Sequence, residues 1–252
     1  MLSAAEIRDR ATHLKSTLPP HVRLIAVSKF VPAAAIRAAY EAGIRDFGES
    51  RVQEAAKKRA ELADLPDITW HLIGHLQTNK VRQALQLFDW IHSLDRWQLA
   101  ERINTVLRET GIPSPRCLLQ VKLRPDPQKY GWERWELEAV LPQLDALSHL
   151  HCCGLMTILP LGLPPAEQLQ VFQELRAWGE TLSTQPWQHL QWQEYSMGMT
   201  QDYPLAVQAG ATMVRIGTAI FGDRLSPFPS TQPNAAEETR VTIPQYLRQS
   251  SH

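Results

Sequence analysis

The sequence predicts an α/β fold, a closed (β/α)8 barrel (TIM barrel), and three observations lead to this prediction. Eight short apolar runs alternate along the chain with segments of helical periodicity. Repeated strand–helix units require parallel strands, because only a helical crossover returns the chain to the same edge of the sheet. The chain has 252 residues, and one such barrel typically takes about 250. Eight units at this length favour a closed barrel over an open, doubly wound sheet.

The first half of the chain is predicted to form an amphipathic helix and four strand–helix units. Ser3 and Glu6 make a capping-box pattern at the start of a helix over residues 3–17. Pro32 opens the next helix, and Gly43 stands where a helix commonly ends. The four units are strand 23–28 with helix 32–42, strand 46–48 with helix 50–62, strand 69–73 with helix 77–87, and strand 90–94 with helix 96–109.

The second half supplies four more strands and a C-terminal extension. The strands are predicted at 117–123, 151–158, 190–195 and 213–216. Helices are predicted at 133–146 and 203–208, and a long helix that follows the Pro/Gly-rich loop 159–165 is predicted to end near residue 182. No eighth helix clearly follows Gly222, so we expect the N-terminal helix to cover the side left open. Residues 1–222 are therefore assigned to the barrel, and 223–252 to an extension that is partly disordered or docked on the surface.

Composition narrows the class of protein. Lys plus Arg and Asp plus Glu both total 26, so the formal net charge is zero and gives no electrostatic footprint for nucleic acid or an anionic membrane. The N-terminus lacks a basic and apolar leader, and no apolar run approaches the roughly 20 residues of a membrane span. Three cysteines, two of them adjacent, form neither a disulfide framework nor a zinc pattern, and Cys117 and Cys153 are expected in the core. We expect a cytoplasmic monomer.

Lys29 is the residue with the clearest chemical meaning. It follows the apolar run that forms the first predicted strand, at the end of the barrel where function resides. An amine buried beside apolar walls has its charged form disfavoured, so its pKa falls and it can attack aldehydes. Lys29 is thus a candidate Schiff-base lysine, and the alternative is a surface lysine at a strand end.

The last two strands end in segments suited to a phosphate group. Ser196-Met197-Gly198-Met199-Thr200 offers hydroxyls, a glycine for close backbone approach, and Thr200 as a helix cap. Gly217-Thr218, at the end of the neighbouring strand, also offers a glycine and a hydroxyl. The alternative for each is an ordinary tight turn. With Lys29, these loops suit pyridoxal 5′-phosphate (PLP), whose ring nitrogen Arg215 is placed to contact. The alternative for Arg215 is a salt bridge within the barrel, with Glu194 as one candidate partner.

The chain resembles the PLP homeostasis family (the YggS/PROSC group), whose fold is like the N-terminal barrel of alanine racemase. The matching segments run in family order from about residue 3 to 222 and include Ala26-Val27-Ser28-Lys29, Asp46-Phe47-Gly48-Glu49, Trp70-His71-Leu72-Ile73-Gly74, Leu76-Gln77-Thr78-Asn79-Lys80, Gly154-Leu155-Met156, Ser196-Met197-Gly198-Met199, Val214-Arg215-Ile216-Gly217-Thr218 and Phe221-Gly222. The resemblance implies that Lys29 carries PLP as an internal aldimine. It also implies that Ser196, Gly198, Gly217 and Thr218 hold the phosphate, and that Arg215 and Met156 line the site.

Four residues depart from the pattern expected of that family: Phe30, Ser50, Arg96 and Lys122. Ser50 and Lys122 stand where contacts to the cofactor ring are expected. His71 and His75 are four residues apart, but Gly74 between them breaks helical metal-ligand spacing. We expect a packed His71, a solvent-facing His75 and no metal.

Three functions remain open for such a site. The first is a PLP-binding homeostasis protein without robust turnover, with apo forms of PLP-dependent enzymes as possible partners. The second is a PLP-dependent amino-acid racemase. It is disfavoured because the second acid/base of alanine racemase comes from an additional domain and a dimer partner, and because an arginine at the ring nitrogen weakens the electron sink. The third is a Schiff-base aldolase acting on sugar phosphates, which would hold no PLP on Lys29.

Overall fold

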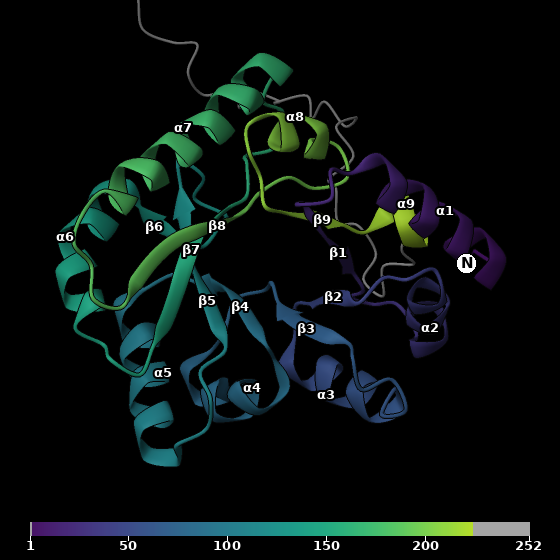
Figure 1. Ribbon diagram of the computed structural model, residues 1–252, viewed down its shortest axis with the longest axis horizontal. Coiled ribbons are helices and arrows are strands. Elements are labelled where there is room, and N and C mark those ends of the chain that lie inside the picture. The colour runs from purple at the N-terminus through teal and green to yellow at the C-terminus, as the bar shows by residue number, and fades with distance from the viewer. Residues whose placement is uncertain (1, 224–252) are drawn as a thin grey trace, which may run out of the picture.

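The computed structural model describes residues 2–223, so the predicted extension lies outside the described residues, apart from Asp223. Eight parallel strands close into a barrel, in the order β1-β2-β3-β4-β5-β7-β8-β9 and back to β1. The strands gather at the centre and the helices form an outer ring (Figure 1). The predicted (β/α)8 barrel is confirmed.

The observed elements follow the predicted order closely. The strands are β1 Arg23–Val27, β2 Asp46–Glu49, β3 Thr69–Leu72, β4 Trp90–Leu94, β5 Arg116–Lys122, β6 Trp132–Glu133, β7 His151–Thr157, β8 Leu190–Ser196 and β9 Met213–Ile216. The helices are α1 Ala4–Thr17, α2 Ala33–Glu41, α3 Val52–Glu61, α4 Val81–Leu87, α5 Trp97–Thr110, α6 Arg134–Asp145, α7 Pro165–Ser183, α8 Tyr203–Gln208 and α9 Thr218–Phe221, with a 3-10 turn η1 at Thr78–Lys80.

The first and last helices of the described residues meet on one side of the barrel. Helix α1 starts with the predicted capping box, in which Ser3 and Glu6 bind each other's backbone N–H groups. It packs against α2 and against α9, a four-residue helix between Gly217 and Gly222 that the sequence pattern did not reveal. Helix α1 therefore covers the side that so short a helix leaves open, as expected (Figure 1).

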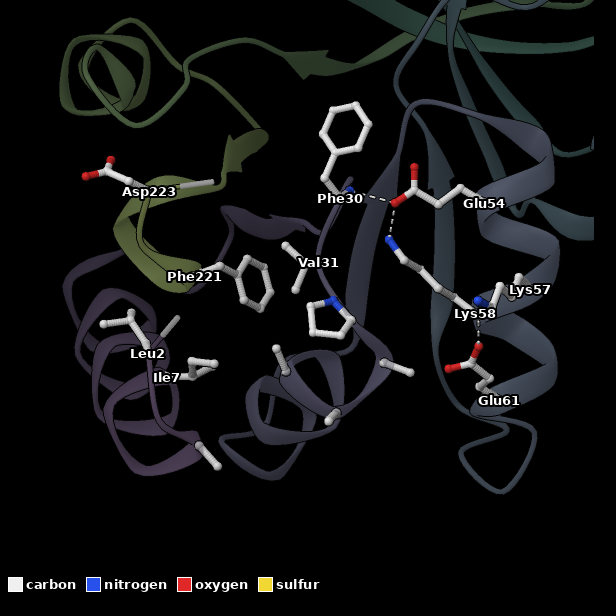
Figure 2. A pocket seen from close by; sticks show the side chains of 15 residues that line it. Leu2, Ile7, Phe30, Val31, Glu54, Lys57, Lys58, Glu61, Phe221 and Asp223 are labelled. Carbon is white, nitrogen blue, oxygen red and sulfur yellow. Dashed lines mark hydrogen bonds and ion pairs between the residues drawn. The ribbon is translucent and has the colours of Figure 1, made fainter. Parts of the chain in front are cut away.

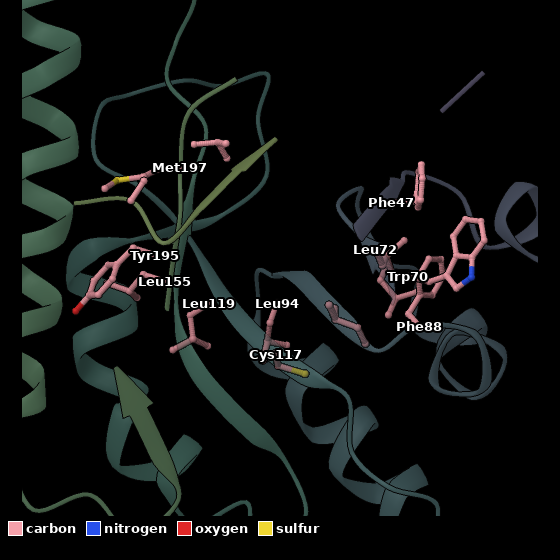
Figure 3. Close-up of a cluster of buried hydrophobic side chains, with 14 of the residues drawn as sticks. Phe47, Trp70, Leu72, Phe88, Leu94, Cys117, Leu119, Leu155, Tyr195 and Met197 are labelled. Carbon is pink, nitrogen blue, oxygen red and sulfur yellow. The ribbon is translucent and has the colours of Figure 1, made fainter. Parts of the chain in front are cut away.

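Apolar side chains form two layers. The larger lies between the strands and the surrounding helices, and Figure 3 shows part of it, with Trp70, Leu119 and Tyr195 among the labelled side chains. A smaller cluster fills the barrel interior and includes Ile25, Met156 and Met213. Cys117, Cys152 and Cys153 are free and buried, which confirms the core assignment of Cys117 and Cys153. Within residues 2–223, no helix is both long and apolar enough to cross a membrane.

Candidate functional site

A cavity of about 290 Å³ opens where the barrel strands reach their C-terminal ends. The residues around it come from the ends of β1 and β9, from the segments that follow β1, β2, β3, β7, β8 and β9, and from the first turn of α7. Its lining consists of Val27, Lys29, Ser50, Ile73, Ile158, Leu159, Pro160, Leu161, Gly162, Gln168, Met199, Thr200, Gln201, Asp202, Arg215, Gly217 and Thr218. Barrels of this class place their binding residues at this end, and the volume is near the lower limit for small-ligand sites.

Four of the seven predicted site residues line this cavity: Lys29, Arg215, Gly217 and Thr218. Lys29 and Arg215 reach it from neighbouring strands, because β1 pairs with β9 in the barrel. An amine and a guanidinium from separate ends of the sequence thus share one cavity. The arrangement offers a nucleophile and a fixed positive charge, which is the pair of groups that the aldehyde and the ring nitrogen of PLP would need.

The other three predicted residues lie outside the lining, and their contact with a cofactor stays a prediction. Met156 is fully buried in the cluster inside the barrel. Gly198 has φ +88°, a left-handed backbone that favours glycine, and its carbonyl accepts the Arg215 backbone N–H at 3.0 Å. The Ser196 side chain is also fully buried and binds Arg215.

Arg215 is held almost entirely inside the protein, with 3% of its surface exposed. Nη1 donates to Ser196 Oγ at 2.6 Å, and Nη2 donates to the Thr157 carbonyl at 2.8 Å. These bonds engage two of the five N–H groups of a guanidinium. The alternative of a salt bridge to Glu194 is wrong, because that carboxylate instead accepts from Thr212 Oγ1 at 2.7 Å.

The charge of Arg215 survives its burial. Burial lowers the pKa of Arg215 to about 10, and the Asp202 carboxylate opposes this change. The guanidinium is therefore protonated at neutral pH. A buried cation needs its hydrogen bonds satisfied, and the two oxygens from Ser196 and Thr157 supply part of that.

A chain of hydrogen bonds runs from Arg215 through the barrel interior. Ser196 Oγ lies 2.9 Å from His92 Nδ1, and His92 Nε2 lies 2.9 Å from His71 Nδ1. His71 Nε2 lies 2.9 Å from Asp46 Oδ1. Burial lowers the pKa of His71, and lowers that of His92 further, so both imidazoles are neutral at pH 7.

Only one set of proton positions fits this chain with neutral imidazoles. The Asp46 carboxylate can only accept, so His71 donates from Nε2 and accepts at Nδ1. His92 then donates from Nε2 and accepts the Ser196 hydroxyl proton at Nδ1. The Ser196 oxygen is left to accept from Arg215. Every donor points the same way, from Arg215 towards Asp46, and the Ser196 hydroxyl proton is already committed to His92.

The two histidines singled out in the sequence differ in their surroundings. His71 is packed and fully buried, as predicted. His75 is partly exposed, with 26% of its side chain accessible, and it also has partners that were not predicted: its Nδ1 lies 2.7 Å from Asp95 Oδ2, and its ring stacks on Tyr130 with 3.8 Å between centroids. Sequence spacing could not show that these partners approach. In the described part of the chain, no group of three or more His, Cys, Asp or Glu side chains could hold a metal ion.

In the loop after β8, sequence reasoning gave Thr200 the wrong role and did not single out Asp202, which lines the cavity. Thr200 does not cap a helix as expected; its Oγ1 accepts the Gly217 N–H at 3.4 Å and so joins the two loops. Helix α8 begins at Tyr203, as predicted, directly after Asp202, whose Oδ1 accepts the Met199 N–H at 2.5 Å. Pro204, in the first turn of α8, is typical of such a helix start.

Two of the positions that depart from the family pattern now have a place. Ser50 lines the cavity. Lys122 pairs with Glu133 at 2.7 Å and is not among the lining residues. Of these two substitutions, only Ser50 lies within the wall of the site.

A larger hollow of about 600 Å³ lies elsewhere, among residues of α1, α2, α3 and α9. Figure 2 shows its apolar side, with Leu2, Ile7, Val31 and Phe221, and its charged side along α3. Neither Lys29 nor Arg215 is among its lining residues. The smaller cavity is therefore the candidate cofactor site.

Known proteins similar to this chain fall into one group by sequence and a wider one by fold. The model of the family "Alanine racemase, N-terminal domain" matches residues 2–225. The pyridoxal phosphate homeostasis protein of Synechocystis sp. is 51% identical over 210 residues, which are 83% of this chain and 95% of the relative. The protein of the same name from Pseudomonas aeruginosa is 42% identical over 221 residues, 88% of this chain and 92% of the relative.

Solved structures agree with this grouping. PipY of Synechococcus elongatus PCC7942, solved with PLP bound, is 54% identical with a TM-score of 0.81, over 86% of this chain and 100% of PipY. Alanine racemase from Bacillus anthracis is 19% identical with a TM-score of 0.68, over 91% of this chain and 58% of the racemase, and this similarity concerns the fold alone. The chain belongs to the alanine racemase N-terminal domain family and, within it, to the pyridoxal phosphate homeostasis proteins.

Proposed function

We propose that the protein binds PLP at the strand-end cavity and takes part in PLP homeostasis, holding the cofactor as a Schiff base on Lys29 without robust turnover. The observation that carries this proposal is that Lys29 and Arg215 line one cavity. The Synechocystis relative, 51% identical, is named for PLP homeostasis, and PipY, 54% identical, was solved with PLP bound, and both support the same role here.

The chemistry of the lining divides between the parts of PLP. Lys29 supplies the amine for the aldehyde, and Gly217 and Thr218, with Ser196 and Gly198 in the neighbouring loop, are proposed to hold the phosphate. Arg215 is proposed to donate to the ring nitrogen, and Met156 to support the ring from the barrel interior. In the described structure the Ser196 hydroxyl donates to His92 and accepts from Arg215, so Ser196 would bind the phosphate by turning this hydroxyl proton away from His92.

A racemase is less well supported by the same cavity. Its ionisable lining residues, among those the structure describes, are Lys29, Asp202 and Arg215. Asp202 is bound to the Met199 N–H, and Arg215 is protonated and fixed by two oxygens. Two-base racemisation needs a second group that exchanges a proton at neutral pH. A protonated arginine also leaves the pyridine nitrogen largely unprotonated, and bound PLP would supply only a weak electron sink for carbanion chemistry.

The binding claim is tested by colour and by mass. The purified protein with PLP should absorb visible light, lose the band on borohydride reduction, and yield a reduced adduct on the peptide containing Lys29. Lys29→Ala should show neither the band nor the adduct. A colourless wild-type protein with no adduct would overturn PLP binding and favour the aldolase alternative.

The homeostasis claim needs separate assays. We expect transfer of PLP from the protein to an apo form of a PLP-dependent enzyme at a rate that differs from that of free PLP. We expect no robust racemisation of D- or L-alanine. Fast racemisation would replace the carrier role with an enzymatic one. Cytoplasmic location and a monomeric state, checked by fractionation and by light scattering, complete the proposal.

A further inference from the structure

The two peptide groups that flank Lys29 are both held by side chains from helix α3. The Ser28 carbonyl, on the N-terminal side, accepts from Lys58 Nζ at 2.7 Å. The Phe30 N–H, on the C-terminal side, donates to Glu54 Oε1 at 2.6 Å. Each of these groups belongs to a planar peptide bond that includes Lys29. Fixing both planes therefore fixes the backbone of Lys29 and the direction in which its side chain leaves.

Lys58 links these contacts to one another. Besides Ser28, its ammonium donates to Glu49 Oε1 at 2.8 Å and to Glu54 Oε1 at 2.6 Å, which engages all three of its N–H groups. Only 6% of the residue is exposed. Figure 2 shows Lys58 and Glu54 reaching from α3 towards Phe30. A buried ammonium needs such partners to offset its desolvation, so this lysine has a defined position.

Glu49 anchors the group to the barrel. It ends strand β2, is fully buried, and accepts at Oε1 from both Lys58 and the Ser28 hydroxyl, the latter at 2.6 Å. Oε2 has no hydrogen-bond partner among the described residues. Burial raises the pKa of Glu49, and the Lys58 charge opposes the rise. The cluster thus depends on Lys58 for its charge balance as well as for its shape.

The backbone beside Lys29 is strained where the cluster holds it. Phe30 has φ +62°, and it is the only non-glycine residue in the described chain with a positive φ. Left-handed backbone is unfavourable for a residue with a Cβ. Strain of this kind persists where surrounding contacts fix it, and it collects at functional sites. Here the Glu54 carboxylate binds the N–H of the strained residue itself.

We propose that Lys58, Glu54 and Glu49 are positioning residues that aim the Lys29 amine at the aldehyde of PLP. This inference rests on the proposed function. In the reaction they serve, the amine adds to the aldehyde carbon, and the carbonyl oxygen leaves as water with the two amine hydrogens. Hydrolysis reverses the step with no oxidant or reductant. The three residues touch neither reactant and act through the backbone of Lys29.

The variants are chosen to separate the positioning of the Lys29 amine from the stability of the folded protein. Lys58→Met removes the contact and the charge, and Lys58→Met with Glu49→Gln removes the contact while restoring charge balance. Glu54→Gln keeps an acceptor for the Phe30 N–H, whereas Glu54→Leu does not. Lys57→Met is the matched control, because Lys57 is the neighbour on α3, its side chain is 81% exposed, and it pairs only loosely with Glu61 at 3.8 Å.

Three quantities are measured for each variant with PLP as the probe. Total bound PLP is measured by release in alkali, the covalent fraction by borohydride reduction and intact mass, and stability by the melting temperature without PLP. We expect the covalent fraction relative to total bound PLP to fall about tenfold in both Lys58 variants and in Glu54→Leu. Glu54→Gln and Lys57→Met should stay near wild type. The double variant should recover melting temperature relative to Lys58→Met without recovering the covalent fraction.

The outcomes are distinguishable from failure of the proposed function. If wild type forms no adduct on Lys29, PLP binding itself fails. If wild type forms it and the variants form it to the same covalent fraction, the positioning role fails and PLP binding stands. A covalent fraction that recovers with melting temperature in the double variant would also overturn the inference. If Lys58→Met does not fold, the contrast between Glu54→Leu and Glu54→Gln decides alone.

Discussion

Lys29 and Arg215 line the same cavity from neighbouring strands, yet the protein holds them in opposite ways. Lys29 is held through its backbone by charged side chains that reach in from outer helix α3. Arg215 is held through its guanidinium by a serine, a carbonyl and, behind the serine, neutral imidazoles inside the barrel.

The difference follows from where counter-charges are available. Near α3, two carboxylates meet the Lys58 ammonium directly, so charge-assisted hydrogen bonds can form there. Inside the barrel, burial keeps His71 and His92 neutral, and an additional positive charge beside Arg215 would be unfavourable. A one-way chain of neutral donors and acceptors orients the guanidinium without adding charge to it. The amine that must react is positioned through the peptide groups on either side of Lys29, whereas the fixed cation of Arg215 is bound directly at its guanidinium.

The largest effect is expected where the backbone contributes to holding Arg215. Gly198→Ala would place a Cβ 2.6 Å from Ala206 Cβ and 2.9 Å from Tyr203 Cα, at φ +88°. Overpacking and left-handed strain together should lower the free energy of unfolding by about 3–5 kcal/mol. Gly162→Ala is the control, because Gly162 has φ +83° but nothing lies within 4 Å of its added Cβ. Its loss should be about 1 kcal/mol, from backbone strain alone. Equal losses in denaturant melts would mean that the close packing at Gly198 does not matter.

A matched pair of buried serines compares the two regions directly. Ser196→Ala leaves Arg215 Nη1 and His92 Nδ1 without their shared partner, and should lower the free energy of unfolding by about 2–4 kcal/mol. Ser28→Ala removes one donor from Glu49 Oε1, which Lys58 still satisfies, so the loss should be about 1 kcal/mol. Chemical denaturation of both variants measures the difference. A larger loss in Ser28→Ala than in Ser196→Ala would show that stability depends more on the charged cluster around Lys58 than on the hydrogen-bond chain from Arg215 to Asp46.

The hydrogen-bond chain through the neutral imidazoles of His92 and His71 should also make the free energy of unfolding depend on pH. The folded pKa of His92 is depressed by burial and by the nearby His71, Arg215 and Arg23. Below the unfolded pKa of about 6.5, the unfolded chain binds a proton that the folded protein does not, so stability falls as the pH falls. His92→Gln should remove up to about 1.4 kcal/mol of that loss per pH unit below 6.5. His71 acts in the same direction, and Glu49, whose pKa is raised, acts in the opposite one.

The contribution of His92 is isolated by comparing how the free energy of unfolding of wild type and of His92→Gln depends on pH, because the other titrating groups are the same in both proteins. Denaturant melts between pH 5 and 8 should give His92→Gln a shallower slope than wild type below pH 6.5, and the same slope above it. His13→Gln is the control, because His13 is exposed. A slope unchanged by His92→Gln would contradict a neutral, buried His92 and with it the proton positions assigned to the chain.

The sequence was sufficient for most of the fold because the signals involved are local. Apolar runs bounded by residues such as Pro32 and Gly43 predicted every barrel strand to within two residues. Strand β6 has two residues and helix α9 has four, too few to show a period, so neither was predicted.

The site could be predicted only in part, for a related reason. Lys29 and Arg215 stand at strand ends, where residue type alone is informative. Lys58 lies on a charged helix that reads as solvated, and its burial arises only when α3 packs beside β1 and β2. The hydrogen bond between His71 and His92 joins residues 21 positions apart on neighbouring strands, and no spacing rule reports it. What escaped prediction is the support behind the site, which depends on tertiary contacts.

The smallest effect tests whether the cluster around Lys58 is truly shielded from solvent. Arg37, on α2, and Asp64, which follows α3, form an exposed ion pair with two hydrogen bonds at 2.7 and 2.8 Å. The Arg37 guanidinium holds the pKa of Asp64 below its usual range. Salt screens exposed charges and hardly reaches buried ones. In 1 M NaCl, Arg37→Met should therefore differ much less from wild type in free energy of unfolding than it does at low salt, whereas the difference between Lys58→Met and wild type should stay the same. Melts of both variants and wild type at low and high salt give this comparison. If salt reduced both losses alike, the Lys58 ammonium would be solvated, and a solvated ammonium could not fix the peptide groups on either side of Lys29.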